Sequence, residues 1–460
     1  MAFQPAEVCV RDVGRPAGVG GLAPGAPPRA GDILAPGFAM SVGAWIVAYL
    51  SFVPLVTRHP SGQVIVSLML AVVFVGGLLA ARYSEKGALA ALLAGLVSGI
   101  LDILIVGAVF YDLAKPGELG RVALLWIAGS VLLNTVVAGL GGLVGRFLPA
   151  RRRGRIRWAS VFALVLAAAT LPLITAGGLV TAYGVGMSVP DWPLSFGNDM
   201  FLYPLSQMQA RPGTFYEHAH RLLGTLVGLT SLAVAIYVNV VHRRTRLVPV
   251  AWAIFAAVFV QGLLGGFRVT QDSIPLATIH GIFAQVVFAS MACLAVAASQ
   301  AFAQAPPPQS GSMDRLFSSA LVLALILQLA LGALVRQRVD SLVLLHITLA
   351  GAVTIVAFVC GFRAVIIGTA PGREPLISIG ISVLSAIGVQ LLLGVIALIL
   401  RPATAADIKT TPSALWTTAH QANGAALLAL CAVLGLWYWR LFSSRPRPAA
   451  LIGPSASLSA

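Results

Sequence analysis

The chain has 460 residues, of which 58% are hydrophobic and only 10% are charged, and its mean hydropathy is +0.92. Apolar runs of about 20 residues, the length that a helix needs to cross a bilayer, recur from end to end and argue against a soluble protein. The formal charge of +15 does not indicate a nucleic-acid partner, because the arginines lie in short loops between apolar runs.

The four cysteines do not form a disulfide or metal-binding pattern. Cys9 lies in a polar stretch, and Cys293, Cys360 and Cys431 each lie inside an apolar run. No CxxC pair is present, so neither a disulfide framework nor a thiolate metal site is indicated.

The N-terminal third of the chain has no recognisable motif. Residues 1–32, rich in Gly, Pro and Ala, predict a disordered cytoplasmic tail. Residues 33–150 predict a four-helix membrane segment of unknown role. Its apolar runs lie near 36–57, 63–81, 87–111 and 122–145. Asp102 lies within the third run, where a polar residue is a functional candidate or a helix-packing contact.

A basic linker follows at residues 146–157 and sets the predicted topology. It contains Arg151, Arg152, Arg153 and Arg155, and the positive-inside rule places it in the cytoplasm. Eight further apolar runs lie near 158–182, 217–241, 248–268, 276–300, 316–336, 342–362, 375–400 and 414–439. The chain is therefore predicted to be an all-α polytopic membrane protein of about 12 helices, with both termini and a tail at 440–460 in the cytoplasm.

The long connection at residues 183–216 falls on the outer side in this topology. Pro190, Pro193, Pro204 and Pro212 forbid a continuous helix there, so we expect an ordered cap with short helical pieces. The stretch TFYEHAHRLLG follows at Thr214–Gly224. On a helix Glu217 and His220 share one face and form a candidate site, whereas His218 points to the opposite side.

Three later helices repeat a pattern. QGLLG at Gln261–Gly265, QLALG at Gln328–Gly332 and QLLLG at Gln390–Gly394 are each followed on the next helix by a histidine. The first helix of the set keeps Gly177 and Gly178 without the glutamine and is followed by His220. Such repetition is typical of duplicated membrane bundles, here predicted as tandem four-helix bundles at residues 158–300 and 316–439.

The repeat places four histidines at one depth near the outer face. They are His220, His280, His346 and His420. Two histidines per bundle, on different helices, are the arrangement that clamps a planar haem from both sides. Four unrelated structural histidines are the alternative explanation, and zinc is disfavoured because no HExxH or Cys/His cluster is present.

Arginines at the same depth are candidates for pairing with haem propionates, or else for contacts with lipid headgroups. They are Arg221, Arg268, Arg336, Arg338 and Arg401.

The motifs TAGGLVTAYGVGMSVPDWPLSFG and YEHAHRLLG, with the helices that carry the three later histidines, resemble haem A synthase over residues 158–439. That membrane enzyme oxidises the C8 methyl group of haem O to the formyl group of haem A for cytochrome oxidase. The resemblance implies that His220 and His280 are axial ligands of the substrate haem, with Glu217 as the catalytic residue beside it. It also implies that His346 and His420 ligate the iron of a haem B cofactor.

The chain departs from the family in two ways. Many members have a cysteine pair in the outer loop, where this chain has Val189 and Ser195. The four-helix segment at residues 33–150 has no counterpart in the family's eight-helix core.

Two other functions stay open at this point. A di-haem b-type electron carrier linked to quinone uses the same histidines, and a haem-handling transporter fits the repeats. We expect an integral protein of the bacterial cytoplasmic membrane, with haem sites toward the outer face. The expected partners are haem O synthase and cytochrome oxidase assembly factors, with homo-oligomer formation left open.

Overall fold

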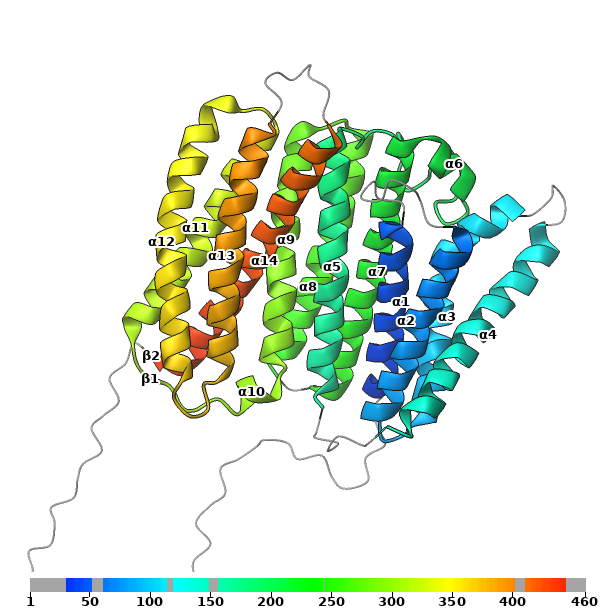
Figure 1. Cartoon of the computed structure of the whole chain (residues 1–460), viewed down its shortest axis with the longest axis horizontal. Helices are drawn as coiled ribbons and strands as arrows, with labels where there is room; N and C mark the ends of the chain where they lie inside the picture. The colour runs from blue at the N-terminus through cyan, green and yellow to red at the C-terminus, as the bar shows by residue number, and fades with distance from the viewer. Residues whose placement is uncertain are drawn as a thin grey trace, which may run out of the picture.

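The computed structural model describes residues 30–51, 61–113, 119–148, 156–243, 245–401 and 410–443. Within these ranges, twelve helices are long and apolar enough to cross a membrane. The protein is therefore an all-α polytopic integral membrane protein, as the apolar runs predict. Figure 1 shows its helices side by side, with the start of α1 and the end of α14 at the same end of the molecule.

The first four helices pack against one another. They are α1 (Gly31–Leu50), α2 (Gly62–Tyr83), α3 (Ala88–Leu113) and α4 (Leu119–Gly145). Asp102 is buried between α1 and α3, where its carboxylate accepts a 3.0 Å hydrogen bond from the Trp45 indole. Ser41 on α1 also bonds to Ser98 on α3 at 3.1 Å. Through its contact with Trp45, Asp102 holds α1 and α3 together.

The predicted start of the first helix is wrong. The helix begins at Gly31 and not near residue 36, so the end of the predicted tail is helical, with Pro36 inside. Pro36 has no backbone N–H group and therefore removes one hydrogen bond of the helix. Asp32 is buried, accepts a 2.5 Å hydrogen bond from Ser84 and pairs with Lys86 at 3.7 Å.

Other predicted ends lie partly outside the described residues. The parts that lie outside are residues 1–29, the four arginines of the basic linker and residues 444–460. Of the predicted C-terminal tail, residues 440–443 are structured, because α14 continues to Leu441 and the strand β2 (Phe442–Ser443) follows it. β2 pairs in parallel with β1 (Gln309–Ser310).

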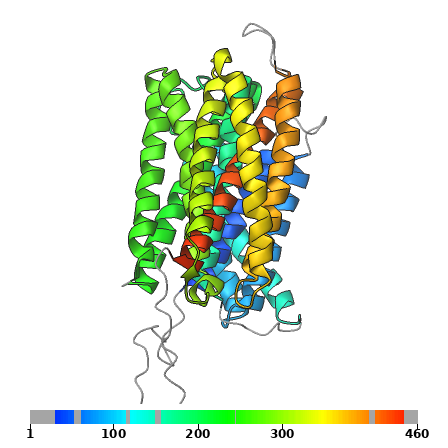
Figure 2. The same cartoon turned by 90° about the vertical axis from the view of Figure 1, so that its left-hand side faces the viewer.

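The other eight long helices form two rings of four. The first ring consists of α5 (Trp158–Tyr183), α7 (Pro212–Val241), α8 (Leu247–Thr270) and α9 (Ile274–Ala297). The second ring consists of α11 (Ser312–Arg336), α12 (Val343–Gly368), α13 (Pro375–Ile399) and α14 (Thr411–Leu441). Helix α14 packs against both α5 and α9, so it joins the rings. Figure 2 shows the same near-parallel helices from the side of the second ring.

Shorter elements close the two ends of the molecule. α6 (Leu205–Ala210) lies in the outer connection, α10 (Gln300–Ala303) joins the two rings, and a 3-10 turn (Asp340–Leu342) precedes α12. α6 confirms the expected cap with short helical pieces. The helix after it starts at Pro212, five residues before the predicted position, because proline suits the first helical position.

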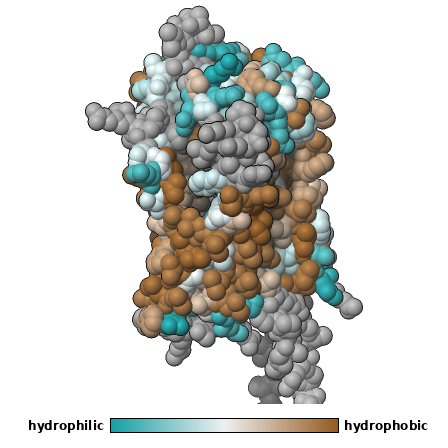
Figure 3. All heavy atoms as spheres, turned by 90° about the vertical axis from the view of Figure 1, so that its right-hand side faces the viewer, coloured by the Kyte–Doolittle hydropathy of each residue, from teal (hydrophilic) through white to brown (hydrophobic). Residues whose placement is uncertain are grey.

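The N-terminal four helices lie beside the first ring. Helix α1 contacts α5 and α7, and α3 contacts α6. At the end of this contact near the start of α7, Tyr49 on α1 stacks on Phe215 of α7, with their ring centroids 5.9 Å apart. Figure 3, which views this flank, shows an apolar surface over its middle and lower parts and hydrophilic residues gathered at the top.

Candidate functional site

A cavity of about 460 Å³ lies inside the first ring, a size typical of small-molecule pockets. All four helices of the ring line it, and the cap contributes Trp192, Pro193 and Met200. Five of the residues predicted from the sequence come together here. They are Glu217, His220, Arg221, Arg268 and His280.

His220 and His280 face each other across this cavity. Their ring centroids are 6.3 Å apart, and the ring planes cross at 81°. The Nδ1 atom of His220 lies 3.2 Å from the Leu173 carbonyl, and that of His280 lies 3.1 Å from the Gln261 carbonyl. When Nδ1–H donates to such a carbonyl, Nε2 is left unprotonated and able to bind a metal.

Each of the four predicted histidines packs against a glycine of the preceding long helix. A Cβ atom placed on Gly177 would lie 2.8 Å from Cε1 of His220. The same atom on Gly265, Gly332 or Gly394 would lie 3.0 Å from the histidine that follows it. Any side chain at these positions would therefore push the imidazole away. The repeated glycines therefore leave room for the histidine rings, and we call these four positions the glycine seats.

A glutamine contacts three of the four histidines. In the first ring, the amide nitrogen of Gln261 lies 3.0 Å from Nδ1 of His280. The amide nitrogen of Gln390 lies 3.2 Å from Nδ1 of His420, and that of Gln328 lies 3.4 Å from Nε2 of His346. The repeated glutamine thus holds the histidine of the next helix. Among the described atoms, Nδ1 of His346 is buried without a hydrogen-bond partner.

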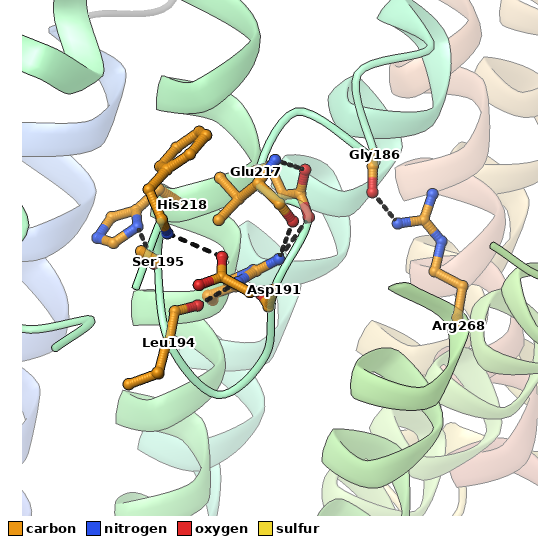
Figure 4. Close-up of polar contacts among 10 residues, drawn as sticks. Gly186, Asp191, Leu194, Ser195, Glu217, His218 and Arg268 are labelled. Carbon is orange, nitrogen blue, oxygen red and sulfur yellow. Dashed lines mark hydrogen bonds and ion pairs between the residues drawn. The ribbon is translucent and has the colours of Figure 1, made fainter. Parts of the chain in front are cut away.

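Glu217 and Arg221 tie the cap to α7. Figure 4 shows Glu217 beside Asp191 and Leu194 of the cap. The Glu217 carboxylate accepts a 2.9 Å bond from the Val189 amide and a 2.8 Å bond from Arg221. Arg221 also donates to the carbonyls of Val189, Asp191 and Leu194 at 2.6–3.0 Å. Glu217 is only 3% exposed yet lines the cavity, so it is both an anchor of the cap and a charged group of the site.

His218 points away from the cavity, as the helical spacing predicts. Its Nδ1 lies 3.1 Å from the Ser195 hydroxyl, and its ring packs 5.4 Å from that of Tyr203. The ring is fully buried between α7 and the cap. His218 therefore belongs to the packing of the cap, beside the site and not within it.

Asp191 orders the tip of the cap. Its carboxylate accepts 2.8 Å and 2.7 Å bonds from the amides of Phe196 and Gly197. Partial burial alone would raise the pKa of Asp191, but these two bonds and nearby Arg221 outweigh it and lower the pKa below its ordinary value. The side chain is therefore ionised in the folded cap near neutral pH.

The other predicted arginines have separate surroundings. Arg268 donates to the Gly186 carbonyl at the edge of the cap, and Arg401 pairs with Asp340. Arg338 lies in the turn after α11 with a φ angle of 69°. Arg336 lies between the rings, where it donates to the Gly178 carbonyl at 2.6 Å and to the Gln421 amide oxygen. Of the five arginines, only Arg221 and Arg268 line the cavity.

Gln421 and Trp192 also line the cavity, although the sequence does not predict them as site residues. Gln421 reaches the cavity from the second ring, and the signal for it was a polar residue directly after His420 in an apolar run. Trp192 of the PDWPL motif covers Gly266, where a Cβ atom would come within 2.5–2.7 Å of the indole. A single sequence gives no sign that Trp192 and Gly266 lie so close together.

The residues present fit haem in both rings. With metal–nitrogen distances of about 2 Å, two imidazoles on opposite sides of one ion have ring centroids about 6 Å apart, close to the observed separation of His220 and His280. In the second ring, the two histidines have the same glycine seats, and His346 has an unpartnered ring nitrogen. No described group of three or more His, Cys, Asp or Glu residues could hold a metal ion.

Comparison with known protein families agrees with the motifs. Residues 160–351 match the COX15-CtaA family, which is described as cytochrome oxidase assembly protein. The matched region runs from α5 into α12 and contains Glu217 with three of the four histidines. The comparison with curated proteins gives no match. Over residues 160–351, this chain is therefore similar to the COX15-CtaA family of cytochrome oxidase assembly proteins.

Proposed function

We propose that the protein is a haem A synthase, which oxidises the C8 methyl group of haem O to a formyl group. The facing imidazoles of His220 and His280, in a cavity that Glu217 also lines, carry this proposal. The family match supports a role in the assembly of cytochrome oxidase. Haem A is a prosthetic group of that oxidase. The long cap over the cavity supports an enzyme, because a pure electron carrier does not need one.

In this proposal the first ring binds the substrate. His220 and His280 would hold haem O from its two faces, with Nε2 free because each Nδ1 faces a main-chain carbonyl. The cap residues Trp192 and Pro193 line the cavity and would limit the access of water to it.

Glu217 would act on charge and protons at the reacting group. Conversion of a methyl group to an aldehyde removes four electrons and, with water as the oxygen source, four protons. A carboxylate fixed by Val189 and Arg221 can stabilise positive charge that develops nearby, or accept a proton and pass it on. Its place at the outer end of the cavity suits the second role.

The second ring would hold haem B through His346 and His420. When bound, haem B supplies one-electron redox chemistry. Gln328 and Gln390 would orient the two imidazoles, and Gly332 and Gly394 would leave room for them. The acceptor of the electrons, and partners such as haem O synthase, are further parts of the proposal.

The decisive experiment is to express the protein in a host that makes haem O but no haem A, and to separate the extracted haems by chromatography. Haem A, or its hydroxymethyl precursor, should appear only when the protein is present. Unchanged haem O beside protein that purifies with haem B would indicate the electron carrier instead. Protein that binds no haem would contradict both functions.

A further inference from the structure

One residue of the second ring reaches the first-ring cavity. Gln421 of α14 lines the cavity, although it directly follows His420, a predicted ligand of the other site. Gly178 of α5 permits this approach. A Cβ atom at Gly178 would lie 2.8 Å from Cγ2 of Thr418 and 3.4 Å from the Gln421 amide oxygen. The two sites therefore meet at the contact between α5 and α14.

Arg336 fixes the orientation of the Gln421 amide. A guanidinium can only donate hydrogen bonds, so the group that faces it must be the amide oxygen of Gln421. The amide nitrogen must then point away from Arg336. Within the described part of the chain this nitrogen has no hydrogen-bond partner, although its side chain lines the cavity. Gln421 thus offers a donor to whatever the cavity holds.

Arg336 also makes the surroundings of Gln421 electropositive. Its two bonds go to neutral oxygens, those of Gly178 and Gln421, and no described carboxylate lies within ion-pair distance of it. A partly buried cation without a carboxylate favours an anionic ligand nearby. A donor with a positive charge behind it suits a carboxylate.

We propose that the Gln421 amide nitrogen binds a carboxylate of the porphyrin in the first-ring cavity, and that Arg336 acts as a positioning residue behind it. This inference rests on the proposed function, because it requires a porphyrin in that cavity. It assigns substrate contact to a residue of the second ring, and it changes the expected role of Arg336 from a propionate ligand to a support of Gln421.

The test uses the full chain purified in detergent and two probes, iron protoporphyrin IX and its dimethyl ester, which has no free carboxylates. Each probe is titrated while its Soret band is followed, and binding that disappears in the His280→Ala variant is assigned to the first ring. Wild type should bind the acid more tightly than the ester. Gln421→Met should weaken binding of the acid by about tenfold, the value of one hydrogen bond to a charged group, and weaken the uncharged ester by a smaller factor.

A double-variant comparison tests the role of Arg336. If Arg336 only orients Gln421, Arg336→Met should weaken binding of the acid by a similar factor. The double variant should then bind the acid no more weakly than either single variant. Additive losses would overturn the positioning role. Gln300→Met on α10, away from both sites, is the control for loss of a glutamine amide.

Failure of this inference differs from failure of the proposed function. Equal, His280-dependent binding of the acid by wild type and Gln421→Met overturns the contact with Gln421 alone. If wild type binds neither probe in a His280-dependent way, the porphyrin site itself is refuted. An equal decrease for the acid and the ester in Gln421→Met would mean that the variant does not lose recognition of a charge, and would also overturn the carboxylate contact.

Discussion

The two rings share one repeat but differ around their histidines. In both, a glycine seats the imidazole. In the first ring, a connection of residues 184–211 folds over the cavity, and Nδ1 of each histidine lies within hydrogen-bond distance of a main-chain carbonyl. In the second ring, α11 and α12 are joined by residues 337–342 only, and glutamine side chains contact both imidazoles. In the first ring, Gln261 contacts His280 in the same way. A common frame therefore supports two sites, of which the first has a long cap with charged groups and the second has only a short connection.

The largest effects should come from removing one histidine from each ring. His280→Ala should abolish haem A formation and lower haem content, because it removes one of two facing ligands. His420→Ala should remove haem B from the second ring and leave binding in the first. Pyridine haemochrome spectra and haem chromatography measure both effects. If the two variants lose the same haem, the assignment of separate sites is wrong.

Filling a glycine seat should have the next largest effect. Gly177→Val would place its Cβ atom 2.8 Å from Cε1 of His220, so we expect at least a tenfold loss of porphyrin affinity in the first ring. Gly388→Ala on α13 is a matched control, since a Cβ atom there meets nothing within 4 Å. Unchanged binding by Gly177→Val, measured by titration, would contradict the seating role.

A smaller change should separate the two roles of Glu217. Glu217→Gln keeps an acceptor for the Val189 amide but removes the charge, whereas Glu217→Ala loses both contacts with the cap. If the charge is catalytic, Glu217→Gln should bind porphyrin normally and make haem A at least tenfold more slowly. Haem chromatography after timed expression measures the rate. A normal rate in Glu217→Gln with a defect in Glu217→Ala would mean that Glu217 only anchors the cap.

The smallest expected effect is a pH dependence of the cap. Asp191 has a folded-state pKa below its ordinary value of 3.8. Its carboxylate therefore stabilises the cap above that value, and this contribution is lost as the pH falls through the lower, folded-state pKa. Hydrogen exchange at residues 196–197, corrected for its intrinsic pH dependence, should accelerate only in that acidic range. Asp191→Asn should show faster exchange already at neutral pH, and equal exchange in both proteins would refute the role of Asp191.

The helices and the repeat could be predicted from the sequence because both depend on local patterns. Apolar run length predicts the spans, and the spacing of Gln, Gly and His is visible in one chain. The first helix was misplaced because Pro36 resembles a start, whereas the anchor of Asp32 comes from distant Ser84 and Lys86.

The partners of the arginines could not be predicted in the same way. Arg221 binds three carbonyls of the cap, and Arg336 binds one carbonyl of α5. Main-chain carbonyls occur at every residue, so the sequence has no signal that distinguishes those an arginine will reach. Gln421 was missed for the same reason, because its contact depends on how closely α14 approaches α5.

The adjacent glycines of α5 have a consequence for the modularity of the protein. Gly177 seats His220 inside the first ring, while Gly178 receives Thr418, Gln421 and Arg336 from the second. One turn of a single helix therefore serves both halves of a duplicated chain. Either half expressed by itself would expose the surfaces that this turn joins, so the two halves, although built alike, are expected to function only as one unit.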